Sequence, residues 1–115
     1  MRADDRVRIL HMVEACEALL RFTAGRERSA LDSDEMLLFA VVRAVEVVGE
    51  AASKVTQETC DKYPHIPWRA IVGMRNRLIH AYFEIDMDMV WVAATQEIPM
   101  LLSQLQQIAT SSTDP

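Results

Sequence analysis

Cysteine, glycine and proline are scarce in this chain, and each scarcity excludes a class of protein. The 115 residues include two cysteines, three glycines and four prolines. Cys16 and Cys60 have no C-x-x-C spacing, so we expect reduced thiols and neither a disulfide framework nor a metal clip. With half of the residues hydrophobic, disordered and collagen-like chains are also excluded. We therefore predict one compact domain at residues 1–109, followed by a polar tail at residues 110–115.

Long apolar runs and a secretory leader are also missing. The longest uninterrupted apolar run, residues 36–42, ends at Arg43 and is far shorter than the roughly 20 residues that cross a bilayer. Asp4 and Arg6 precede any apolar stretch, whereas a signal peptide begins with a short basic segment and an apolar core. We therefore expect a cytoplasmic protein with no membrane contact.

Hydrophobic residues at helical spacing, in contrast, run through almost the whole chain. Four main helices are predicted, at residues 4–24, 33–60, 67–81 and 87–109. Asp4 is the expected cap of the first helix and Gly25 its end, and Ser33 begins the second helix. Asp86 should cap the fourth helix, and Pro99 should kink or restart it. The predicted fold class is therefore all-α, an up-and-down bundle of four main helices plus a short helix or turn.

The second predicted helix is apolar over well more than half of its circumference, so we expect it to be buried on more than one side. A polar stripe with members three or four residues apart also runs along it: Arg43, Glu46, Glu50 and Lys54. A solvated, self-paired face would explain this stripe, and so would a bundle helix that lines a subunit interface. If this helix forms the interface of a homodimer, a charge at Val45 should break it.

Charge is distributed unevenly along the chain. The net charge is -5, yet residues 62–83 contain four basic residues and no acid, so this window carries +4 and the remainder -9. A basic island in an acidic protein indicates an anionic ligand there, and it argues against non-specific binding to duplex nucleic acid. Arg69 and Arg77 are the candidate substrate contacts of this island.

Residues 75–82, with the sequence RNRLIHAY, carry side chains suited to phosphodiester chemistry. Arg75 offers a planar fork of donors for phosphate oxygens, His80 can exchange a proton near neutral pH, and Asn76 can hold either of them in place. Around a regular helix Arg75 and His80 are about 140° apart, so one helix does not easily direct both at one small target. A two-fold dimer that lays this helix against its symmetry mate would bring two copies of His80 together, one as base and one as acid. A bland alternative is that these side chains are only solvated or bonded to terminal carbonyls.

This octapeptide resembles the R-x4-H-x-Y motif of the HepT-like proteins of the HEPN superfamily. Residues 47–52 (VVGEAA), 67–76 (PWRAIVGMRN) and 97–99 (EIP) are similar to further signatures of that family, and the resemblance covers most of residues 33–105. It implies a HEPN helical bundle that dimerises. It also implies a metal-independent RNA endonuclease toxin, without a cofactor, whose active site forms across the dimer from both copies of the motif.

The resemblance also implies roles for single residues. Arg75 would bind the scissile phosphate, His80 would act as general acid or base, and Asn76 would support them. Tyr82 stands at the position to which a cognate nucleotidyltransferase antitoxin, similar to MntA, attaches AMP. Two other readings stay open: a non-catalytic HEPN module that binds a nucleotide or a partner and regulates it, and a dimeric scaffold with a decayed site.

Overall fold

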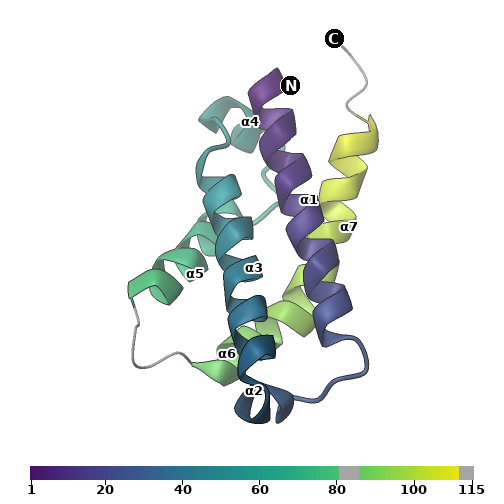
Figure 1. Ribbon diagram of the computed structural model, residues 1–115. Helices are drawn as coiled ribbons and strands as arrows, with labels where there is room; N and C mark the ends of the chain where they lie inside the picture. Colours follow the sequence, from purple (N-terminus) through teal and green to yellow (C-terminus); the bar gives the residue numbers. More distant parts are fainter. Residues whose placement is uncertain (81–85, 112–115) are drawn as a thin grey trace.

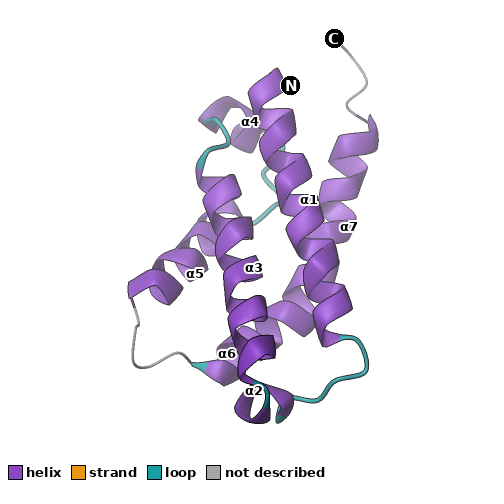
Figure 2. Cartoon of the chain, viewed as in Figure 1, coloured by secondary structure: helices purple, strands orange, loops and turns teal. Residues whose placement is uncertain are grey.

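The computed structural model describes residues 1–80 and 86–111, and within them every regular element is helical (Figures 1 and 2). In chain order the elements are α1 (Ala3–Thr23), α2 (Ala30–Ser33), α3 (Glu35–Ser53), α4 (Gln57–Lys62), α5 (Trp68–His80), α6 (Met87–Val92), the π-helical turn η1 (Ala93–Glu97) and α7 (Ile98–Ser111). The main contacts join α1 to α3 and α7, and α3 to α5. The predicted all-α class is thus confirmed. No helix of the described part is both long and apolar enough to span a membrane.

The hydrophobic core lies mainly between α1, α3 and α7. Its largest fully buried side chains include Ile9, Met12, Leu19, Val41, Val48 and Leu105. Burying a side chain of this size stabilises the fold by about 1.5–3 kcal/mol. The Cys16 thiol is also buried here, and this burial raises its pKa to about 12. Cys16 and Cys60 are both free thiols, as predicted.

Val45, which the sequence suggested for a subunit interface, belongs to this core instead. Its side chain is 4% exposed and packs in the main buried cluster. A charge at Val45 would therefore disturb the folding of the single chain, and it does not test a subunit interface. The large apolar side chains that α3 does expose are Met36 and Phe39, at 83% and 64%.

Three predicted helix boundaries are wrong. The single helix expected over residues 33–60 is interrupted after Ser53, so that α3 and α4 are separate elements. Asp34, and not Ser33, caps α3, since its Oδ1 accepts a hydrogen bond of 3.0 Å from the backbone N–H of Leu37. At α1 the expected cap, Asp4, lies inside the helix, and Arg2 occupies the cap position without a side-chain hydrogen bond.

The neighbouring acid, Asp5, explains why the chain turns after α3. This carboxylate is 1% exposed. It accepts hydrogen bonds from the backbone N–H of Thr56 at 2.9 Å, from the Thr56 hydroxyl at 2.5 Å and from the Thr59 hydroxyl at 2.6 Å. These bonds tie the first turn of α1 to the first turn of α4, more than 50 residues further along the chain. A long-range contact therefore ends the helix where no glycine or proline does.

We expect Asp5→Ala to lower the free energy of unfolding by about 3 kcal/mol near neutral pH, because three donors lose a charged acceptor. Burial alone would raise the pKa of Asp5, but the hydrogen bonds from Thr56 and Thr59 outweigh it and lower that pKa. The carboxylate therefore stabilises the fold above the pKa of the unfolded chain, about pH 4, and loses this effect as the pH falls through the lower folded-state pKa. Urea unfolding of both proteins from about pH 7 toward pH 2 measures this change. A difference that stayed constant over that range would contradict it.

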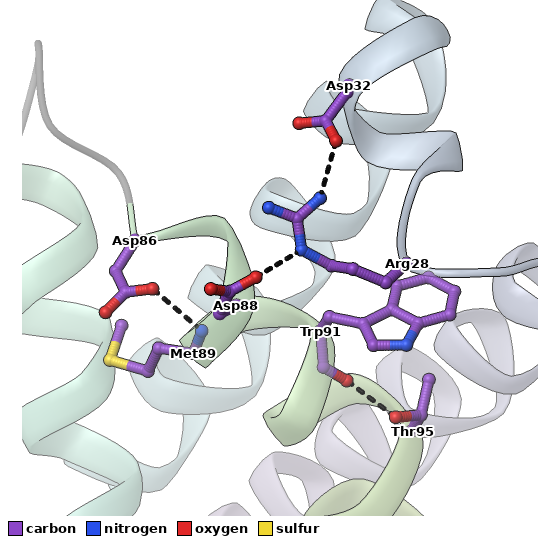
Figure 3. Close-up of polar contacts among 7 residues, drawn as sticks. All are labelled: Arg28, Asp32, Asp86, Asp88, Met89, Trp91 and Thr95. Atoms are coloured by element: carbon purple, nitrogen blue, oxygen red, sulfur yellow. Dashed lines mark hydrogen bonds and ion pairs between the residues drawn. The ribbon is translucent and has the colours of Figure 1, made fainter.

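Asp86 and Pro99 act as predicted in the last predicted helix. Asp86 caps α6, since its Oδ1 accepts a hydrogen bond of 3.0 Å from the backbone N–H of Met89 (Figure 3). Pro99 restarts the helix, because the π turn η1 precedes it and α7 begins at Ile98. Proline cannot donate to a carbonyl in the preceding turn, so a change of helical form just before it relieves the mismatch.

The first turn of α6 is bound to the link that follows α1. Gly25 ends α1 with a φ of 70°, a conformation that glycine adopts without strain. Three residues later, the Arg28 guanidinium binds Asp32 of α2 at 3.0 Å and Asp88 of α6 at 2.6 Å (Figure 3). The stretch between the first two predicted helices is thus helical in its last part and is tied to α6.

Candidate active site

The motif predicted to carry the chemistry lies on α5, which packs on α3 (Figure 1). Arg75 and Asn76 are in the middle of this helix and His80 is its last residue. Tyr82 lies outside the described residues, as does the side chain of His80. The geometry of the site is therefore the geometry of Arg75, Asn76 and their neighbours on α3.

Two polar contacts orient the Arg75 side chain. Its Nη1 donates a hydrogen bond of 2.9 Å to Oδ1 of Asn76, and its Nη2 lies 3.6 Å from Oε2 of Glu50 on α3. Its Nε is buried and has no hydrogen-bond partner in the described part of the chain. The side chain is 26% exposed. The guanidinium is thus held by both of its terminal nitrogens while part of it still reaches the surface, where its remaining N–H groups can donate to phosphate oxygens.

Gly49 makes this close approach of α5 to α3 possible. A Cβ atom at Gly49 would lie 2.2 Å from Cβ and 2.9 Å from Cγ of Arg75, and 3.1 Å from the backbone oxygen of Ile71. Carbon atoms not bonded to each other normally stay about 3.5–4.0 Å apart. No larger residue therefore fits without moving α5. Sequence reasoning gave Gly49 no role of its own, although a glycine inside a long helix costs up to about 1 kcal/mol and was an available signal.

Glu50 is the second residue of the site to which the sequence assigned no catalytic role. The polar stripe of α3 is partly self-paired, as one reading predicted, with Arg43 3.9 Å from Glu46 and Lys54 4.0 Å from Glu50. Glu50 also reaches Arg75, so one end of the stripe joins the motif. Such exposed pairs contribute at most about 1 kcal/mol to stability. Their effect here is on the orientation and charge of the site.

Two grooves flank α5, and they separate the two arginines that were expected to bind substrate. The first groove runs between α5 and the α3–α4 corner, and its polar lining residues are Ser53, Gln57, Asp61, Arg69 and Asn76. The second groove faces α6, η1 and α7, and Arg77 and Glu97 line it. Arg69 and Arg77 are both exposed. A ligand that lies along one groove therefore meets only one of these two arginines.

Chemically, the described part of the site offers an oriented guanidinium, a neutral amide and a carboxylate. A guanidinium of this kind binds a phosphate and stabilises charge that develops on it. In the described part of the chain, no group of three or more His, Cys, Asp or Glu side chains lies where it could hold a metal ion. The donors of the site thus suit an anion.

Comparisons with known proteins agree with the motif. The model of a family described as "Ribonuclease HepT-like" matches residues 12–108. A protein of Methanocaldococcus jannaschii named as a predicted RNase is 35% identical over 107 residues, which are 93% of this chain and 88% of that protein. A protein of Thermococcus cleftensis with the name "Probable ribonuclease HepT" is 36% identical over 97 residues, 84% of this chain and 88% of that protein. No solved structure gives a significant match.

Proposed function

The chain belongs to the HepT-like ribonuclease family, and from this membership we propose that it is a metal-independent endoribonuclease, the toxin of a toxin–antitoxin pair in the cytoplasm. The observation that carries the proposal is Arg75, which begins the R-x4-H-x-Y motif and is oriented by Asn76 and Glu50. The basic island around it supports an anionic substrate. We infer that Arg69 and Arg77 add to the attraction of RNA toward α5.

The proposed reaction is an attack of the ribose 2′-oxygen on the adjacent phosphorus. The bond from phosphorus to the 5′-oxygen breaks, so the products are a 2′,3′-cyclic phosphate and a 5′-hydroxyl. One group must take the 2′-hydroxyl proton and another must protonate the leaving 5′-oxygen, and His80 is the proposed general acid or base. Arg75 would stabilise the negative charge that grows on the phosphate oxygens, and Asn76 would hold the guanidinium in place.

We infer that the complete site forms in a homodimer. One chain supplies only one histidine to the motif, and the positions of Arg75 and His80 are about 140° apart around the helix axis. A two-fold axis would supply a second copy of each residue. The exposed apolar side chains Met36 and Phe39 on α3 support an interface on that helix, in place of the buried Val45.

If α3 forms this interface, Phe39→Glu should make the protein monomeric and inactive, because a charge would be buried among apolar groups. Sedimentation velocity reports the oligomeric state, and circular dichroism shows whether the chain is still folded. Val7→Glu on α1 is a matched control, since Val7 is also an exposed apolar residue, at 46%. A Phe39→Glu protein that stayed dimeric and active would contradict this placement.

The proposed partner of the toxin is an MntA-like nucleotidyltransferase antitoxin that acts on Tyr82. Transfer of AMP from ATP would form a bond between the tyrosine oxygen and the α-phosphorus and release pyrophosphate. On a continued helix, Arg75 and Tyr82 would be two turns apart on nearly the same side. A bulky anion attached there would compete with RNA for the guanidinium and would block the site sterically.

A second candidate function is a non-catalytic module that binds a nucleotide or a partner and regulates it. The acidic net charge of -5 supports it, and so does Glu50, which already provides a negative partner for Arg75. This function predicts saturable nucleotide binding without cleavage in any buffer.

Cleavage of an end-labelled RNA by the purified protein in EDTA separates the two functions. We expect product bands that carry a cyclic phosphate, and these bands should be lost with His80→Ala. If the protein cleaves no RNA, and intact mass shows Tyr82 to be unmodified, the nuclease proposal is wrong and the binding module is favoured.

A further inference from the structure

Four positions of α5 fall along one line of the helix, and this line borders the groove between α5 and the α3–α4 corner. They are Arg69, Gly73, Asn76 and His80, which follow one another at intervals of four, three and four residues. At about 100° per residue they lie within about 60° of arc and extend over roughly 16 Å. Arg69, Gly73 and Asn76 line the groove. The groove therefore leads along α5 toward the position of the proposed acid or base.

Gly73 leaves room for something outside the chain to approach this line. A Cβ atom built on Gly73 would meet no other atom of the described chain within 4 Å, so internal packing does not require glycine there. Alanine would form the helix better. Gly49 is the opposite case, since its Cβ would collide with α5. A glycine that leaves open space on a helix surface lets a ligand come close to the backbone.

The charges of the groove favour an anionic occupant over a second copy of this helix. The α5 wall of this groove carries one arginine, Arg69, and no acid, so a second copy of the same wall would bring like charges together in the groove. Asp61 is the one acid among the groove's lining residues, and it lies on the α4 side, where it accepts a hydrogen bond of 2.7 Å from Gln57. The α5 wall is thus positive, and the opposite wall offers an acceptor.

We propose that this groove is the path of the single RNA strand, a proposal that rests on the ribonuclease function given above. The phosphates follow the α5 line, with Arg69 binding a phosphate several positions away from the scissile one and Gly73 allowing the backbone of the strand to pass close to the helix. The bases face away from that line, where Pro64 of the loop before α5 and Trp68 at the start of α5 provide apolar surface for stacking, and Asp61 of α4 accepts hydrogen bonds from amino groups.

The test compares the steady-state cleavage of a labelled oligonucleotide and of a dinucleotide by the parent, Arg69→Ala and Gly73→Leu. For the oligonucleotide we expect Arg69→Ala to raise KM about tenfold at nearly constant kcat, and to reduce the slope of log KM against log salt by about one. Gly73→Leu should raise KM similarly without lowering Tm. The dinucleotide is too short to reach Arg69, so Arg69→Ala should not change its KM. Arg21→Ala, which removes the same charge from an exposed site on α1, controls for the general loss of charge.

Three outcomes would overturn the proposal. If Arg69→Ala keeps the KM and salt slope of the parent while His80→Ala is inactive, the function stands and the groove is not the path. If Gly73→Leu changes sedimentation but not KM, a second copy occupies the groove. If the parent cleaves nothing, the proposed function fails, and fluorescence anisotropy with the same oligonucleotide then tests the groove alone. Equal binding of the oligonucleotide by the parent and by Arg69→Ala would exclude the groove as the RNA path.

Discussion

Replacing His80 with alanine should lower the kcat of RNA cleavage by at least about a hundredfold, because a positioned acid or base contributes about 10²–10⁴ to a rate. Alanine is the best helix former, so the last turn of α5 should persist. We therefore expect Tm to change little. Single-turnover cleavage of a labelled RNA in EDTA measures the chemical step, and RNA affinity should stay within about threefold of the parent, since His80 is proposed to move protons and not to anchor the strand.

A matched control for this variant is His65→Ala. His65 is an exposed histidine in the proline-containing loop before α5 and does not belong to the motif. Its replacement removes the same type of side chain and should leave the cleavage rate unchanged. If His80→Ala degraded RNA at the rate of an active parent, the acid–base assignment would be wrong.

Gly49→Ala should lower both stability and activity, although alanine favours a helix. The added methyl group would overlap Cβ of Arg75 at 2.2 Å. Relief of that overlap requires α5 to move away from α3, and overpacking of this kind costs about 1–3 kcal/mol. For a chain of this size we expect Tm to fall by about 5 °C for each kcal/mol. Because the same movement displaces the Arg75 side chain, kcat/KM should fall by more than about tenfold.

Gly73→Ala is the control, because it also adds one methyl group in place of a glycine hydrogen, on α5, the helix that Gly49 contacts. Its methyl group would enter open space, so Tm should rise slightly as helix propensity improves. Thermal unfolding of the two variants together separates packing from propensity. Equal stability of Gly49→Ala and the parent would mean that the contact between α3 and α5 is looser than described.

Hydrophobic spacing and punctuation were sufficient to predict the all-α class and most helix ends. Gly25, Asp86 and Pro99 act as expected, because each does so through its own backbone or the next few residues. The break after Ser53 was not predictable in this way. It depends on Asp5, whose carboxylate reaches Thr56 and Thr59 only when the chain has folded.

In the candidate site, too, the local features could be predicted from the sequence and the long-range contacts could not. The types and spacing of Arg75, Asn76 and His80 indicated phosphodiester chemistry, since those properties are local to one helix. The contributions of Gly49 and Glu50 come from another helix, and only the packing of α5 on α3 brings them to Arg75. Likewise, Arg69 and Arg77 look equivalent in the sequence, yet they line different grooves because α5 divides the surface between them.

The attachment of α5 mainly to α3 has a consequence for hydrogen exchange and for the control of activity. An element held chiefly by one neighbour can detach in a local opening, at a lower free energy than global unfolding, whereas the amides of α1, which packs on both α3 and α7, are released only when the whole domain unfolds. The fraction of molecules with the motif docked can therefore change while the domain stays folded. RNA, a second subunit or an antitoxin that clamps or releases α5 would adjust catalysis by shifting this local equilibrium.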